Sequence, residues 1–184
     1  MKLYLLRHAE RGHGEEQDQL TEMGIEQSNH LIHYLNSLHL NKIICANTNR
    51  ARKTIEPFLK KFNISTEYTS LVNEQELGDL FGKSGAEYRE QLQKSGLSKE
   101  EFRPKNGENY FDLMNRAKEF LEIMRKEKNQ NILISTHAGF IRSVIILLLN
   151  LPKEKLVFDP VSLTSIEFDD YFNIIQYKLN EKII

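Results

Sequence analysis

The order of strand and helix patterns along the chain constrains its fold more than any other feature. Short apolar or alternating runs predict strands at 2–6, 42–46, 65–70, 131–136, 161–168 and 173–179. Amphipathic or apolar helix patterns occupy 21–38, 50–62, 110–124 and 140–149. Strands that alternate with helices form a largely parallel sheet. The sequence therefore predicts an α/β fold of three layers, with helices on both faces of a mostly parallel central sheet.

Length and composition indicate one domain. The chain has 184 residues, of which 40% are hydrophobic and 28% are charged, and this is enough apolar material for a core. We expect residues 1–184 to form a single domain. The stretch 72–103 departs from the regular pattern, because it contains four glycines and has no sustained period. We expect it to be a loop or lid at the substrate site that carries one or two short helices.

Charge, cysteine content and hydropathy narrow the classes of partner. The net charge of −1 gives no overall field that would attract nucleic acid or an acidic membrane. The single cysteine, Cys45, excludes an intramolecular disulfide and a cysteine-based zinc site. No apolar run is long enough to span a membrane, and the apolar N-terminus is too short for a signal peptide. We therefore expect a cytoplasmic protein that binds neither nucleic acid nor membranes.

Reactive polar residues follow three of the predicted strands. Arg7 and His8 end the first strand, Arg50 comes after the second, and His137 ends the fourth. The carboxyl ends of parallel strands lie at one edge of a sheet, and ligands bind beyond that edge. We therefore expect two imidazoles and two guanidinium groups to meet there.

This set of side chains suits phosphoryl transfer. Arginine keeps its charge and can bind two phosphate oxygens at once. A neutral imidazole can attack phosphorus, and a carboxylic acid can protonate the leaving oxygen. The candidate acids are Glu74, Glu76 and Asp79, of which the spacing to the following glycine favours Glu74. Backbone amides at Ala138 and Gly139, where the strand passes into a helix, would add anion stabilisation.

Six short segments occur in an order that a known family shares. They are L-R-H-A-E at 6–10, L-T-E-M-G-I-E-Q at 20–27, R-A-R-K-T at 50–54, E-Q-E-L-G-D-L-F-G at 74–82, P-K-N-G-E at 104–108 and T-H-A-G-F-I-R at 136–142. Together they resemble the histidine phosphatase superfamily, the phosphoglycerate mutase-like group, over nearly the whole chain. One Arg-His pair alone would be weak evidence, whereas six ordered segments are strong.

The resemblance implies a phosphoglycerate mutase-like fold and a phosphatase of the histidine acid phosphatase type, a phosphoric monoester hydrolase. It implies that His8 is the nucleophile and forms a phosphohistidine intermediate, and that Glu74 is the proton donor. Arg7 and Arg50 would bind phosphate, and His137 would complete the phosphate pocket. We expect neither a cofactor nor a metal. The expected ligand is a small phosphorylated metabolite, a phosphate monoester, or inorganic phosphate.

The chain departs from the family pattern at three glycine or asparagine positions. Ala9 and Ala138 stand where the family has glycine, and an alanine fits there only if φ is negative. Gly14 stands where many members have an asparagine, so one hydrogen bond to phosphate is absent. Arg11 or His13 could replace that bond. We expect the neighbouring cations to lower the pKa of His8, and we expect activity to peak at mildly acidic pH.

Other functions remain open at this point. A phosphomutase or a protein phosphohistidine phosphatase would use the same residues, and a non-catalytic phosphate-binding regulatory protein would keep only the fold. His30 and His33 have helical spacing, but a solvated helix face explains them better than a metal site, because no third ligand is evident. The last predicted strand, 173–179, could pair edge to edge in a homodimer.

Overall fold

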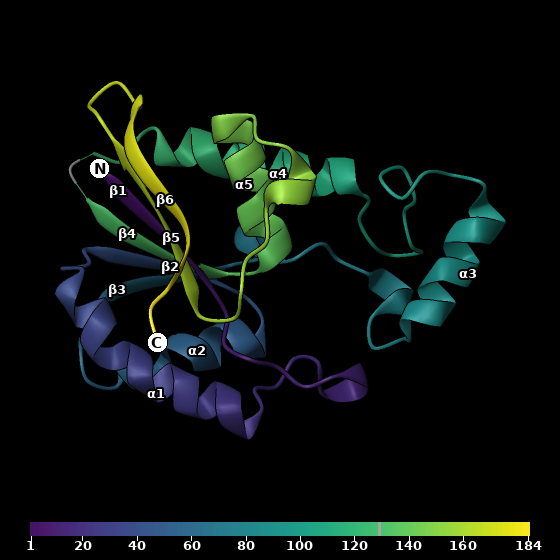
Figure 1. Ribbon diagram of the computed structural model, residues 1–184, viewed down its shortest axis with the longest axis horizontal. Helices are drawn as coiled ribbons and strands as arrows, with labels where there is room; N and C mark the ends of the chain where they lie inside the picture. Colours follow the sequence, from purple (N-terminus) through teal and green to yellow (C-terminus); the bar gives the residue numbers. More distant parts are fainter. Residues whose placement is uncertain (129) are drawn as a thin grey trace.

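A six-stranded sheet forms the centre of the computed structural model, which describes residues 1–128 and 130–184 (Figure 1). Its strands are β1 (Lys2–Arg7), β2 (Lys42–Ala46), β3 (Ser65–Thr69), β4 (Asn131–Thr136), β5 (Ser162–Phe168) and β6 (Ile174–Lys182). They are ordered β3-β2-β4-β1-β5-β6. The first four in this order run parallel, whereas β5 is antiparallel to β1 and β6 is antiparallel to β5. The predicted mostly parallel sheet is confirmed.

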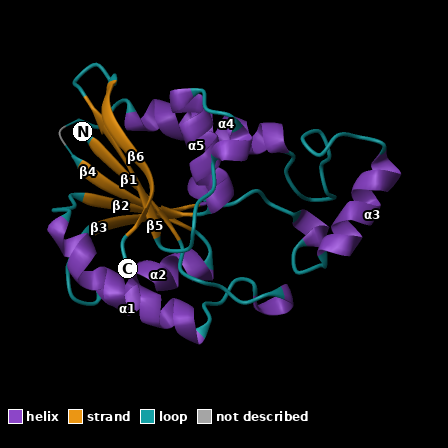
Figure 2. Ribbon diagram, viewed as in Figure 1, coloured by secondary structure: helices purple, strands orange, loops and turns teal. Residues whose placement is uncertain are grey.

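Helices cover both faces of this sheet, as predicted. Helices α1 (Glu22–Ser37) and α2 (Asn49–Leu59) pack together on one face. Helices α4 (Tyr110–Met124) and α5 (Ala138–Leu149) pack together on the other (Figure 2). The three layers follow from the sequence, because each helix has one apolar stripe that must be buried against the sheet.

The core lies between these layers. The inner strands β1, β2 and β4 are buried along almost their whole length, which explains their continuous apolar sequences. Edge strand β3 is largely exposed and correspondingly polar. Between the two helices of one layer, Phe120 and Phe140 pack edge to face with ring centroids 5.5 Å apart.

The predicted start of α1 is confirmed, whereas α2 ends earlier than predicted. Thr21 caps α1, because its hydroxyl accepts a hydrogen bond from Gly24 N at 3.0 Å. Helix α2 ends at Leu59 and not at Phe62. Phe62 still packs on Phe58 with ring centroids 5.0 Å apart, so the apolar stripe continues for one turn beyond the regular helix.

Residues 77–107 project from the body as an arm, and this segment includes most of the predicted loop (Figure 1). The arm contains α3 (Gly85–Ser95), none of whose residues is buried. Its two ends meet where Glu108 N donates a hydrogen bond to Glu76 O at 2.8 Å and Asp79 N donates to Lys105 O at 2.9 Å. The prediction of one or two short helices in this segment is therefore confirmed.

In the described part of the chain, no helix has both the length and the apolar character needed to cross a membrane.

Candidate active site

The register of two parallel strands brings the two predicted histidines together. Strand β1 pairs with β4 so that Arg7 lies opposite Thr136, and His8 N donates a hydrogen bond to Thr136 O at 2.9 Å. His8 and His137 are therefore neighbours at the carboxyl edge of the sheet. Their ring centroids are 5.0 Å apart, and both side chains are buried. The expected meeting of the two imidazoles is confirmed.

The backbone fixes the tautomer of His8. Its Nδ1 lies 2.7 Å from Ala9 O, and a carbonyl oxygen only accepts, so Nδ1 must carry the proton. The lone pair is then on Nε2. Burial lowers the pKa of His8 to about 3, and the positive charges of Arg50 and Arg7 add to this effect. The cations act as predicted, but burial is the larger cause. His8 is therefore neutral at ordinary pH.

His137 is also neutral when the site holds no anion. Burial lowers its pKa well below the ordinary value, and Arg50 acts in the same direction. The protonated form of His137 is therefore not the resting state. The Nε2 atom of His137 lies 3.2 Å from Thr48 Oγ1. Its buried Nδ1 has no hydrogen-bond partner among the described residues.

The two predicted phosphate-binding arginines lie beside the histidines, where Arg50 is buried and Arg7 is half-buried. Arg7 Nη1 donates to Phe158 O at 2.5 Å, and Arg50 Nη1 forms an ion pair with Asp18 Oδ1 at 2.9 Å. Burial lowers the pKa of each guanidinium. In each, the buried Nε has no hydrogen-bond partner within the described residues. Buried donors of this kind require an acceptor, and an anion would supply it.

Glu74 reaches the start of α5 from the loop before the arm. Its Oε2 accepts a hydrogen bond from Gly139 N at 3.0 Å, and its Oε1 accepts one from Gln75 N at 3.1 Å. A Cβ atom on Gly139 would lie 2.0 Å from Glu74 Oε1, so only glycine leaves room for this carboxylate. The Gly139 amide, which was expected to face an anion, is thus occupied by Glu74 instead.

The other two candidate acids lie further out. Glu76 is exposed, and its backbone pairs with Glu108 at the base of the arm. Asp79 is also exposed and accepts a hydrogen bond from Asn106 Nδ2 at 2.9 Å. Of the three carboxylates, Glu74 is the one in contact with the junction of β4 and α5.

A half-buried arginine holds the loop that carries Glu74. Arg116, on α4, donates to the carbonyl oxygens of Leu71, Asn73 and Glu74 at 2.9, 3.0 and 3.1 Å. The same guanidinium forms a two-point ion pair with Glu108, with both distances 2.7 Å. This side chain therefore fixes the backbone from which Glu74 extends, and nothing in the sequence pattern indicated it.

Three further residues around the site were not predicted. Asp18 accepts hydrogen bonds from Asn49 N at 3.1 Å and from the Arg50 side chain, so it joins the loop after β1 to the start of α2. Thr48 contacts His137. Thr54 accepts a hydrogen bond from Ala9 N at 2.9 Å and donates one to Arg50 O at 2.7 Å, and its place in the R-A-R-K-T segment was the only signal for it.

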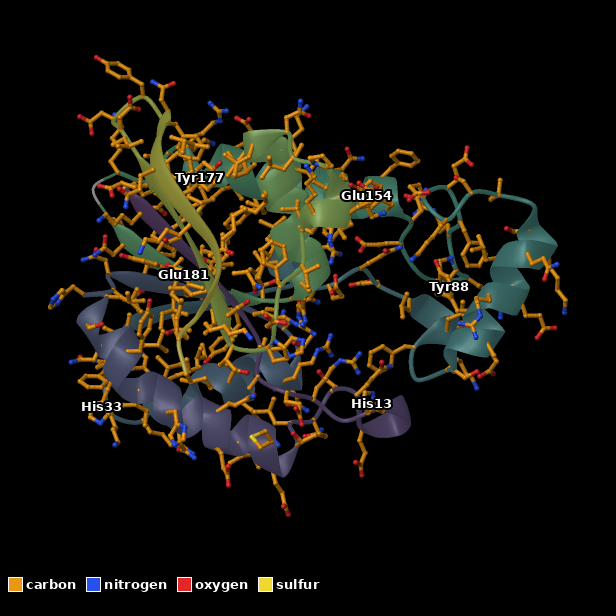
Figure 3. All side chains as sticks on the ribbon, in the orientation of Figure 1. His13, His33, Tyr88, Glu154, Tyr177 and Glu181 are labelled. Atoms are coloured by element: carbon orange, nitrogen blue, oxygen red, sulfur yellow. The ribbon has the colours of Figure 1, made fainter. Side chains whose placement is uncertain are left out.

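The three departures from the family pattern fit the backbone. Ala9 and Ala138 both have negative φ, so their methyl groups cause no strain. Gly14 has φ +58° and is exposed. Arg11 and His13, the proposed replacements, lie on the loop after β1, on which Figure 3 labels His13.

Two hollows are lined by the predicted site residues. The histidine hollow has a volume of about 470 Å³, and its lining includes Arg7, His8, Arg11 and His13. The Glu74 hollow has a volume of about 270 Å³, and its lining includes Arg50, Glu74 and residues at the base of the arm.

His30 and His33 are exposed on α1. Among the described residues, no group of three or more His, Cys, Asp or Glu side chains is arranged to hold a metal ion.

Comparison with known proteins agrees with this geometry. The model of the histidine phosphatase superfamily (branch 1) matches residues 3–180, and the chain belongs to this superfamily. The broad-specificity phosphatase YOR283W of Saccharomyces cerevisiae is 27% identical over 158 residues, which are 79% of this chain and 69% of the yeast protein. The adenosylcobalamin/alpha-ribazole phosphatase of Escherichia coli is 25% identical over 171 residues, covering 85% of this chain and 83% of that protein.

Solved structures share the fold over almost the whole chain. The alpha-ribazole phosphatase from Shigella flexneri superposes with a TM-score of 0.82 at 24% identity, covering 98% of this chain and 96% of that one. A mycobacterial glucosyl-3-phosphoglycerate phosphatase in complex with inorganic phosphate superposes with a TM-score of 0.77 at 20% identity, covering 98% and 97%. These likenesses establish a phosphoglycerate mutase-like α/β fold.

Proposed function

We propose that the protein is a phosphatase that hydrolyses phosphate monoesters through a phosphohistidine intermediate on His8. One observation carries this proposal. The neutral ring of His8 has its lone pair on Nε2, beside the guanidinium groups of Arg7 and Arg50, and each of these has a buried Nε with no hydrogen-bond partner in the described structure. Such a site combines a nucleophile with the charge that a phosphoryl group requires. The two curated relatives, both phosphatases, support it.

In the first step, His8 Nε2 attacks phosphorus and the bond from phosphorus to the ester oxygen breaks. The Glu74 carboxyl group gives its proton to the departing oxygen, and the alcohol leaves. Glu74 suits this role because Gly139 N and Gln75 N orient its carboxyl group at the junction of β4 and α5.

In the second step, the Glu74 carboxylate takes a proton from water. The water oxygen attacks phosphorus, and the bond from phosphorus to His8 Nε2 breaks. Inorganic phosphate leaves, and both residues return to their first state. Because the same carboxyl group gives and then takes a proton, its two forms alternate within one cycle.

The remaining groups would hold the phosphoryl oxygens. Arg7 and Arg50 supply fixed positive charge, and the unpartnered Nε–H groups are the donors we assign to phosphate. His137 is neutral at rest, and a phosphate dianion nearby would raise its pKa, which favours donation to the anion. The Ala138 amide at the start of α5 and the Arg11 side chain are assigned as supporting contacts. We propose that residues 72–103 act as the lid over this site.

Hydrolysis of p-nitrophenyl phosphate tests this proposal. We expect turnover by the wild-type protein and a loss of at least about 10⁴-fold in kcat for His8→Ala. His33→Ala is the matched control, because His33 is exposed on α1 (Figure 3). It should retain the wild-type rate. A His8→Ala protein that keeps the parental rate, or a wild-type protein inactive at every pH, would refute the proposal.

A further inference from the structure

The Glu74 hollow combines an apolar surface with negative charge. Phe81, which is 52% exposed, lines this hollow at its arm side, and Leu77 also belongs to the lining. When an apolar group of a substrate covers exposed aromatic surface, both are removed from water and binding becomes more favourable. A cavity of about 150 Å³ holds benzene, so the volume of about 270 Å³ has room for an aromatic ring.

The charges that line this hollow disfavour a second anion. Its charged side chains are the carboxylates of Asp18, Glu74 and Glu76 and the single cation Arg50. Arg50 already forms an ion pair with Asp18 at 2.9 Å. The histidine hollow has the opposite character, because its lining contains Arg7 and Arg11 against the one carboxylate of Glu10. The histidine hollow therefore attracts an anion, whereas the Glu74 hollow repels one.

We infer that the preferred substrates are phosphate monoesters whose alcohol part carries an aromatic ring and no second anionic group. This inference rests on the proposed function, since it places the leaving alcohol beside Glu74. The phosphoryl group would lie at His8, and the ring would cover Phe81 at the base of the arm. Phe81 is thus a specificity-determining residue for this reaction. A carboxylate on the alcohol part, as in 3-phosphoglycerate, would meet Asp18 and Glu76.

Three alkyl phosphates with primary alcohols as leaving groups test this inference: benzyl phosphate, glycerol 3-phosphate and 3-phosphoglycerate. We expect kcat/KM for benzyl phosphate to exceed that for glycerol 3-phosphate by about tenfold. The value for 3-phosphoglycerate should be lower again by about tenfold. Matching the class of alcohol keeps the intrinsic reactivity of the three esters similar, so differences report on binding in the hollow.

Two variants assign these preferences to residues. Phe81→Ala should lower kcat/KM for benzyl phosphate about tenfold and leave that for glycerol 3-phosphate unchanged. Phe111→Ala is the control, because Phe111 is also 52% exposed but lies on α4 outside both hollows. It should change neither value. Glu76→Gln should raise kcat/KM for 3-phosphoglycerate relative to that for glycerol 3-phosphate.

Equal values for the three esters, or a Phe81→Ala variant that affects all three alike, would overturn the inference. Hydrolysis that still depends on His8 would then leave the proposed function intact. If no ester is hydrolysed by the wild-type protein, the proposed function fails and the inference fails with it.

Discussion

The carboxyl edge of the sheet and the arm differ in how their residues are held. At the sheet edge, His8 and His137 follow buried strands, and strand register places them side by side. In the arm, α3 has no buried residue and Phe81 is half exposed. The edge thus fixes the groups that would act on phosphorus, whereas under our proposal the arm would present its surface to the rest of a substrate.

Glu74 lies at the boundary of these two regions. Its backbone is held from the body by Arg116, and its carboxylate meets Gly139 N at the sheet edge. Two residues further along the chain, toward the arm, Glu76 is already exposed. A carboxyl group next to an exposed segment can therefore still be fixed, because the half-buried side chain of Arg116 and the amide of Gly139 both hold it.

Removal of the proposed acid at the sheet edge should lower kcat more than any change in the arm. We expect Glu74→Gln to lower kcat on benzyl phosphate by about 10²- to 10⁴-fold, because proton donation to the leaving oxygen is lost. Glu76→Gln, two residues nearer the arm, should change kcat on the same ester by less than about threefold. Initial rates for both variants measure this. If Glu76→Gln is the inactive one, the acid has been assigned to the wrong carboxylate.

The same substitution at two glycines compares the edge with the arm directly. Gly139→Ala places a methyl group 2.0 Å from Glu74 Oε1 and should lower kcat by about 10²-fold. Gly85→Ala, in α3, meets only the tip of Arg89 at 3.4 Å and should leave kcat unchanged. Circular dichroism of both variants is the control for folding and should match the wild-type spectrum. Equal activities in the two proteins would show that the position of Glu74 is unimportant.

Arg116→Lys tests the group that positions Glu74. Lysine cannot contact three carbonyl groups and Glu108 together, so we expect a loss of about 2 kcal/mol in unfolding free energy. We also expect about a tenfold lower kcat on benzyl phosphate, with a smaller change on p-nitrophenyl phosphate, whose leaving group needs no proton. Arg125→Lys, on an exposed part of the chain, is the control. An equal loss on both esters would indicate a purely structural role.

The buried histidines should make the free energy of unfolding depend on pH. The pKa of His8 is lowered to about 3 in the folded protein, so between about pH 3 and 6.5 the unfolded chain binds more protons. The contribution of His8 to the free energy of unfolding is therefore fully present above about pH 6.5, and it is lost progressively as the pH falls toward 3. We expect a slope of about 1.4 kcal/mol per pH unit from His8. Urea unfolding from pH 7 to 4.5 measures it, and His8→Asn should have the shallower slope. Parallel profiles would contradict a neutral buried imidazole.

The fold and much of the site could be predicted because their signals are local. The apolar run of β4 and the Thr21 cap each depend on a few consecutive residues. His8 and His137 could be placed together because parallel strands end at one edge. Gly139 is different, since its need for glycine comes from Glu74, which is distant in the sequence.

Other features could not be predicted, for the same reason. Asp18 pairs with Arg50 and Arg116 holds the Glu74 loop, and each contact joins segments that are far apart along the chain. Strand β6 extends to Lys182, beyond the predicted end at 179, because its pairing with β5 has register shifts that interrupt simple alternation.

Trapping of the phosphoryl group tests the central claim most directly. The wild-type protein and Glu74→Gln are mixed briefly with p-nitrophenyl phosphate, quenched in alkali and digested, and the peptides are analysed by mass spectrometry. We predict a phosphoryl group on His8 that accumulates in Glu74→Gln, because activation of water is slowed while a leaving group that needs no proton still departs. Turnover with no phosphoryl group on His8, or with one on another residue, would contradict the mechanism.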